Sequence, residues 1–141
     1  MGVGSALAVA AVFVWLGMVT AISFIEAPLK FRASGVTLPI GLSIGRLVFR
    51  ALNSAEAVLA AIAVLAIALG NVPAPALPAV AAAVAVLFFQ LALVRPALTR
   101  RSDRVLAGQD APRSAGHHVY IALELVKVIA LLAAGTLLLA R

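Results

Sequence analysis

Four long apolar stretches dominate the hydrophobic pattern of the chain. They cover Val3–Ile25, Ala51–Leu69, Leu77–Val94 and Val119–Ala140. About 20 apolar residues in a helix cross the hydrocarbon core of a bilayer, and backbone groups in lipid must be hydrogen-bonded within their own segment. The pattern therefore predicts an all-α integral membrane protein, a four-helix bundle that forms a single four-span transmembrane domain over residues 1–141.

The segment before the second stretch has a helical pattern of its own. Thr37 can cap a helix, and Pro39 can occupy its first turn. Apolar residues then recur on one helical face, at Ile40, Ile44, Leu47 and Val48. We expect an interfacial amphipathic helix that leads directly into the second span. Its Gly41 and Gly45 form a GxxxG pair, which either permits close helix contact or has no partner.

Polar residues interrupt three of the apolar stretches at a similar depth. Glu56 is followed by 13 apolar residues, and 13 residues also separate Lys127 from Arg141. Gln90 comes 13 positions after Leu77, in a span that runs in the opposite direction. At the helical rise of about 1.5 Å per residue, each lies roughly 20 Å from the same membrane face. Ionisable groups at such depth are costly and indicate a functional site.

Two polar stripes connect these residues to the ends of their spans. The fourth span carries His117, Tyr120, Glu124 and Lys127 on one face, and the second carries Arg46, Arg50 and Asn53, with Glu56 displaced to one side. Matching the two helices by depth predicts ion pairs between Glu56 and Lys127 and between Arg50 and Glu124, and it places Arg46 near His117.

Two interpretations of the stripes remain open. The pairs either fix the register of the bundle, or they surround a polar cavity that binds an ion, a proton or a small polar ligand, with Tyr120 and Glu26 at its opening. The candidate ligand-binding residues are Arg46, Arg50, Asn53, Glu56, Gln90, His117, Tyr120, Glu124 and Lys127.

Composition and charge support a membrane protein. Hydrophobic residues make up 65% of the 141 residues and charged residues only 11%, far from the roughly one quarter that is usual in soluble domains. The formal net charge is +6, but most of the charge lies in loops between apolar spans, so we expect no nucleic-acid partner. The chain has no cysteine, which excludes disulfides and thiol chemistry. The N-terminal stretch has no basic residue before it and is predicted to be a retained span.

The basic residues also predict an orientation. Nine of the eleven Lys and Arg residues fall in or beside the first and third loops, at Lys30, Arg32, Arg46, Arg50, Arg95, Arg100, Arg101, Arg104 and Arg113. The positive-inside rule then places these loops in the cytoplasm and both termini outside. The third loop, TRRSDRVLAGQDAPRS, is predicted to be polar and mobile.

Several chemistries are disfavoured by spacing. His117 and His118 are neighbours, so their side chains diverge by about 100° on a helix and do not suit one metal ion or haem. Serine hydrolase, P-loop and dinucleotide signatures are absent. Trp15, Phe88 and Phe89 are interpreted as lipid-facing or packing residues. Thr20 and Ser23 are expected to hydrogen-bond to their own helix. We therefore expect no metal and no cofactor, and we favour a protein that is not an enzyme.

Two resemblances add to this picture. RALNSAE, Arg50–Glu56, resembles the signature of the membrane-associated eicosanoid and glutathione metabolism proteins, although two residues separate Arg50 from Asn53 where that family has three. That resemblance implies four-span trimers with glutathione-binding residues on the second helix. The segments FIEAPLKFRASG, GRLVFRALNSAE and HHVYIALELVK are similar to small bacterial four-span membrane proteins without an assigned biochemical role, which implies fold and topology.

Three functions follow as expectations. The first is binding or permeation of a small polar species or ion at the buried polar site. The second is a glutathione-dependent, transferase-like membrane enzyme, with Arg50, Asn53 and Glu56 as its glutathione-binding residues. The third is an accessory subunit of a membrane complex. We expect a multi-pass protein of the bacterial inner (plasma) membrane, with the lipid bilayer and either further copies of itself or a larger complex as partners.

Overall fold

The computed structural model describes residues 1–109 and 115–140, and within these ranges every regular element is a helix. Four helical segments are long and apolar enough to cross a membrane: Val3–Lys30, Leu38–Leu69, Ala76–Leu106 and His117–Leu139. The prediction of an all-α four-helix bundle is confirmed. The protein is a multi-pass membrane protein.

Two of the four segments are composite helices. The first consists of α1 (Val3–Val19), a π-helical segment η1 (Thr20–Glu26) and α2 (Ala27–Lys30). The second is α3 (Leu38–Leu69). The third consists of α4 (Ala76–Phe89), a π-helical segment η2 (Gln90–Val94) and α5 (Arg95–Leu106), and the fourth is α6 (Ala115–Leu139).

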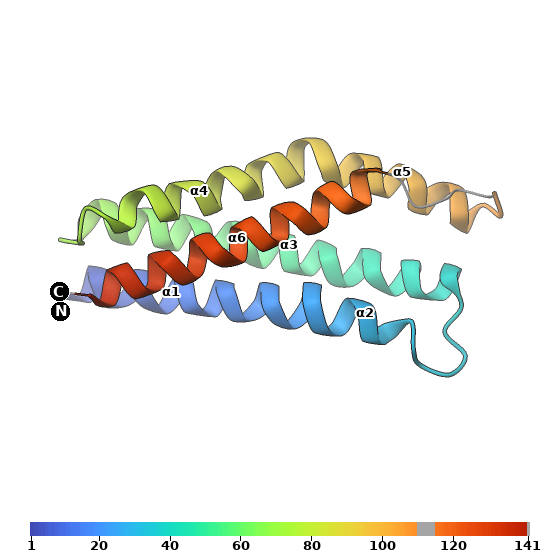
Figure 1. Cartoon of the computed structure of the whole chain (residues 1–141), viewed down its shortest axis with the longest axis horizontal. Helices are drawn as coiled ribbons and strands as arrows, with labels where there is room; N and C mark the ends of the chain where they lie inside the picture. Colours follow the sequence, from blue (N-terminus) through green and yellow to red (C-terminus); the bar gives the residue numbers. More distant parts are fainter. Residues whose placement is uncertain (110–114, 141) are drawn as a thin grey trace.

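The chain termini lie at one end of the bundle, and the helix segments that carry most of the basic residues reach the other end (Figure 1). Both termini are at one end, whereas α5 and the connection between α2 and α3 are at the other. Lys30, Arg46, Arg95, Arg100 and Arg101 lie on the helix segments toward this second end, which we call the basic end.

Small side chains bring the helices together. α1 packs mainly against α3 and α6, and α4 packs against α6. Many of the buried residues are alanines, including Ala8, Ala11, Ala63, Ala83 and Ala134. Many large apolar side chains instead point outward, as expected for a surface solvated by lipid tails, whereas Trp15, Leu52, Leu131 and Leu138 are buried. The core is therefore thin, and the few large or polar groups inside it stand out.

The amphipathic segment before the second span is helical, as predicted, but it is not a separate interfacial helix. α3 begins at Leu38 and continues without a break to Leu69, a length of about 48 Å. The Thr37 hydroxyl accepts a hydrogen bond from the Ile40 amide at 3.4 Å, and Pro39 lies in the first turn. No residue in the segment breaks the helical hydrogen bonds, so the apolar face continues along the bundle.

The GxxxG pair of α3 contacts side chains rather than another helix backbone. A Cβ atom added to Gly41 would clash with the ring of Phe31, and one added to Gly45 would lie 3.2 Å from Lys30 Nζ. The two glycines thus make room for the end of the first helical segment, where the chain turns back into α3.

The third loop differs from its prediction. Its first part, from Thr99 to Leu106, belongs to α5. This polar stretch stays helical because Val105 is buried and Asp103 forms an ion pair with Arg46 on α3, with Oδ1 and Nη1 2.8 Å apart. The rest of the predicted mobile loop, including Arg113, extends into residues 110–114, which lie outside the described residues, as does Arg141.

Both π-helical segments precede a proline that the helix has to accommodate. Pro28 follows η1 and Pro96 follows η2. A proline inside a helix lacks an N–H and clashes with the carbonyl four residues earlier, here that of Phe24 or Ala92. The wider π turn relieves this clash and changes the direction of the side chains within it. Polar residues of the candidate site lie in both segments.

Candidate functional site

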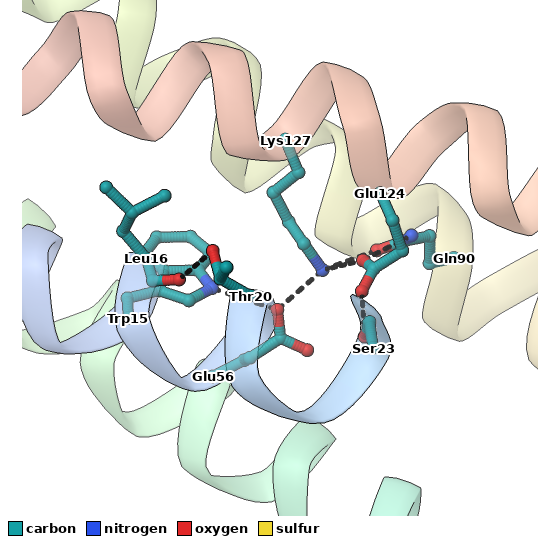
Figure 2. Close-up of polar contacts among 8 residues, drawn as sticks. All are labelled: Trp15, Leu16, Thr20, Ser23, Glu56, Gln90, Glu124 and Lys127. Atoms are coloured by element: carbon teal, nitrogen blue, oxygen red, sulfur yellow. Dashed lines mark hydrogen bonds and ion pairs between the residues drawn. The ribbon is translucent and has the colours of Figure 1, made fainter. Parts of the chain in front are cut away.

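Six polar side chains from all four helical segments meet inside the bundle (Figure 2). We call them the buried polar layer: Trp15 from α1, Ser23 from η1, Glu56 from α3, Gln90 from η2, and Glu124 and Lys127 from α6. Glu56 and Lys127 are 0% exposed, and Gln90 and Glu124 no more than 2%. The predicted common depth of Glu56, Gln90 and Lys127 is confirmed.

Lys127 is at the centre of the layer. Its Nζ lies 2.5 Å from Glu56 Oε1 and 2.6 Å from Glu124 Oε1, and it donates to Gln90 Oε1 at 2.7 Å. An ammonium group has three N–H donors, so the three contacts match its full capacity. The predicted ion pair between Glu56 and Lys127 is confirmed.

Glu124 is hydrogen-bonded through both of its oxygens. Its Oε1 also accepts from Gln90 Nε2 at 2.8 Å, and its Oε2 accepts from the Ser23 hydroxyl at 2.5 Å. The prediction that Ser23 bonds to its own helix is therefore wrong, because the hydroxyl points into the layer from η1. Thr20 does bond to its own helix, donating to the Leu16 carbonyl at 2.8 Å.

The two carboxyl oxygens of Glu56 differ in their hydrogen bonds. Oε1 accepts from the Trp15 indole N–H at 2.9 Å as well as contacting Lys127. Oε2 is buried and has no hydrogen-bond partner. The sequence interpretation of Trp15 as a lipid-facing or packing residue did not anticipate its polar contact. Its position on one helical face with the small residues Ala8 and Ala11 was the available signal that it faces the core.

A cavity of about 1080 Å³ opens between the helices at the basic end and borders the buried polar layer. Five cationic side chains line it: Lys30, Arg46, Arg50, Arg95 and Arg101. Glu124 is the carboxylate in its lining, and it also belongs to the layer. The rest of the wall is mainly apolar, with Phe24, Phe31, Leu42, Phe49, Leu98 and Ile121 among the contributors. We call this the basic cavity.

Arg95 is held in the cavity wall by aromatic rings. Its guanidinium carbon lies 4.9 Å from the centre of the Phe49 ring and 4.6 Å from that of Tyr120. The two rings meet edge to face with centres 6.0 Å apart. The Arg95 Nε and Nη2 atoms and the Tyr120 hydroxyl are buried and make no hydrogen bond within the part of the chain that the structure describes. The rings thus position a cation with two unpartnered nitrogen atoms, Nε and Nη2, among the described residues.

The predicted site residues divide between these two regions. Arg46, Arg50, Asn53, His117 and Tyr120 line the basic cavity, Glu56, Gln90 and Lys127 lie in the buried polar layer, and Glu124 belongs to both.

Some of the predicted contacts differ in detail. The predicted Arg50–Glu124 pair is wrong: Arg50 is exposed, and both oxygens of Glu124 bond to Ser23, Gln90 and Lys127. Arg46 forms an ion pair with Asp103, and it lines the same cavity as His117. Glu26 forms an ion pair with Lys30 at 3.5 Å and does not line the cavity.

Arg95, Lys30 and Arg101 are cavity residues that the sequence interpretation did not select. All three were counted as charges in or beside the loops, because the predicted spans ended before them. In the part of the chain that the structure describes, no three His, Asp or Glu side chains are grouped so that they could hold a metal ion.

Comparisons with known proteins add no relative to this description. No family model, no curated protein and no solved structure matches the chain.

Proposed function

We propose that the protein binds a small anionic molecule in the basic cavity. The observation that carries the proposal is the excess of positive charge among the described lining residues, where five Lys and Arg side chains accompany one carboxylate. Lys30 and Arg46 form ion pairs with Glu26 and Asp103. Among the described residues, Arg50 and Arg95 form no ion pair with an acidic side chain, and an anion in the cavity would supply a partner.

Arg95 is the residue best prepared for such a ligand. Its orientation is fixed by Phe49 and Tyr120, so little side-chain freedom is lost on binding. Guanidinium donors recognise carboxylates and phosphates in pairs, and Nε and Nη2 are the two donors that lack a partner here. The apolar wall around it favours an anion that also carries an apolar portion.

The proposed orientation places the cavity toward the cytoplasm. Basic residues gather at the basic end, whereas the connection between α3 and α4 carries no charge. By the positive-inside rule the basic end is cytoplasmic and both termini are outside, in a plasma membrane. The anion would then enter from the cell interior.

Glutathione is a second candidate, because it is an anion with two carboxylates. Arg50 and Asn53 of the proposed glutathione-binding set both line the basic cavity, which favours it. Glu56, the third member, lies in the buried polar layer and is bonded to Trp15 and Lys127. A glutathione molecule in the cavity would therefore be held by Arg50, Asn53 and Arg95, with Glu56 outside its contacts.

Native mass spectrometry of the full chain, released gently from its own membrane, tests anion binding. We expect a bound anionic molecule on the wild-type protein, at least a tenfold lower occupancy in Arg95→Gln, and wild-type occupancy in Arg100→Gln. Arg100 is an exposed cation of the same helix that does not line the cavity, so it is the matched control.

Two results decide between the candidates. A mass increment that matches glutathione, with calorimetric glutathione binding that is lost in Arg50→Ala, would assign glutathione as the ligand. A wild-type protein that carries no bound anion and gives no heat with glutathione or inorganic phosphate would refute the proposal. The same spectrum reports whether the protein is a homo-oligomer or part of a larger complex.

A further inference from the structure

The buried polar layer has an unbalanced set of ionisable groups. It contains two carboxyl groups, Glu56 and Glu124, and one ammonium group, Lys127. If all three were ionised, the layer would carry one net negative charge at 0 to 1% side-chain exposure. The effective penalty for burying an uncompensated ion is several kcal/mol, and buried groups in this situation usually become neutral instead.

The surrounding charges do not correct this imbalance at Glu56. The cations that line the basic cavity, Lys30, Arg46, Arg50, Arg95 and Arg101, with the neighbouring His117 and Tyr120, lie on the side of Glu124. Glu56 does not line the cavity, and its polar contacts are Lys127 and the Trp15 indole. Lys127 is shared with Glu124, so Glu56 has only part of one cation.

The unpartnered oxygen lies where the negative charge is in excess. Glu56 Oε2 is buried without a hydrogen-bond partner, although the other carboxyl oxygens of the layer each have at least one. The ammonium nitrogen of Lys127 already occupies the position between the two Oε1 atoms. A metal ion beside Lys127 would need several further oxygen ligands, whereas a proton needs only one carboxyl oxygen.

We propose that the buried polar layer is a proton-binding site, in which the Glu56 and Glu124 carboxyl pair holds one exchangeable proton at neutral pH. The proton belongs to the pair, because Lys127 bridges the two groups and whichever carboxylate is ionised can pair with it. Glu124 gives the proton a route to solvent, since this residue belongs to the layer and also lines the basic cavity. This site does not depend on anion binding in the cavity.

Ser23 can accommodate either state of Glu124. Its hydroxyl donates to Glu124 Oε2 when that carboxyl is ionised and can accept from it when the carboxyl is protonated. Gln90 donates through Nε2 to Oε1, which stays an acceptor in both states. The hydrogen bonds of the layer are thus preserved when the proton moves between the two carboxyl groups.

Infrared spectroscopy of the full chain in nanodiscs of neutral lipid tests the proposal. A protonated carboxyl group has a carbonyl stretch that is distinct from the bands of a carboxylate. The chain has five Asp and Glu residues, and an ordinary Asp or Glu side chain has a pKa of about 4, so a band at pH 7 indicates a carboxyl group in an unusual environment. We expect a band of one carboxyl equivalent that shifts on transfer to D₂O.

The variants make the assignment specific. In Glu56→Gln and in Glu124→Gln the remaining carboxylate pairs with Lys127, so the band should disappear in both. Glu26→Gln, which removes an acid outside the layer, should keep the band at full intensity.

Two results would overturn the proposal. One is a wild-type spectrum without the band at pH 7, or with a band that both layer variants retain. The other is a band that appears only when sodium is replaced by choline, which would assign the site to a metal cation. The isosteric Glu→Gln changes keep an acceptor for Trp15 and Lys127, and the wild-type measurement decides the question even if a variant does not fold.

Discussion

Replacing Lys127 with methionine should strongly destabilise the bundle. The change keeps an unbranched apolar side chain but removes the ammonium that joins Glu56 to Glu124. The two Oε1 atoms are at most about 5 Å apart, because Nζ lies 2.5 Å from one and 2.6 Å from the other. If both carboxyl groups were ionised, oxygens at that distance would repel by about 3 kcal/mol at an effective dielectric constant of about 20, so without Lys127 the pair depends on its proton.

The total effect follows from the burial of the pair. Removing one partner of a buried ion pair costs about 3 to 5 kcal/mol, because the other partner is left uncompensated. We expect a loss of this size in the free energy of unfolding of Lys127→Met. Adding Glu56→Gln to the Lys127→Met variant should recover at least half of the lost free energy of unfolding, since only one carboxyl group then remains in the layer.

Equilibrium unfolding in mixed micelles with increasing dodecyl sulfate, followed by circular dichroism, measures these differences. Leu132→Met on the exposed face of α6 is the control and should change stability by less than about 0.5 kcal/mol. The reasoning fails if Lys127→Met is as stable as this control, or if the double-mutant cycle with Glu56→Gln gives no coupling energy.

Two further predictions concern the same core and the orientation of the bundle. Trp15→Phe should lower stability by about 1.5 to 3 kcal/mol in the same unfolding assay, because Glu56 loses a buried hydrogen bond; a variant within 0.5 kcal/mol of wild type would contradict this. In a chain without native cysteine, Ala74→Cys in the α3–α4 connection should react with a membrane-impermeant maleimide in intact cells, whereas Ala107→Cys after α5 should react only after permeabilisation. The reverse labelling pattern would invert the proposed orientation.

The sequence predicts the depth of the polar residues in the membrane, but it does not predict how each helix is rotated about its own axis. Glu56, Gln90 and Lys127 were placed at one level because the rise per residue is the same in every helix. The Arg50–Glu124 pair failed because spacing along one helix does not say how that helix is turned relative to its neighbour. Arg50 faces the cavity and solvent, while Glu124 bonds to Ser23, Gln90 and Lys127.

The inward orientation of Trp15 and Ser23 was harder to predict for a related reason. In an apolar span the lipid-facing and core-facing sides have almost the same hydrophobicity, so hydrophobic periodicity does not distinguish them, and only the small residues on the face of Trp15 indicate the core side. Trp15 therefore resembled any large apolar residue of the span. Ser23 points into the layer from a π-helical turn, whose only sequence signal is Pro28, five residues later. Gln90 is related to Pro96 in a similar way.

The order of the helices along the chain has a consequence for biogenesis. α6 follows the other three helical segments and brings both Lys127 and Glu124. Until it inserts, Glu56 is a carboxyl group in lipid without its cation, and Gln90 lacks both charged partners. A nascent chain that has inserted only three spans therefore exposes polar groups that membrane chaperones and proteases can recognise. Insertion of α6 supplies the partners of these groups together, so they become inaccessible to such factors only when the bundle is complete.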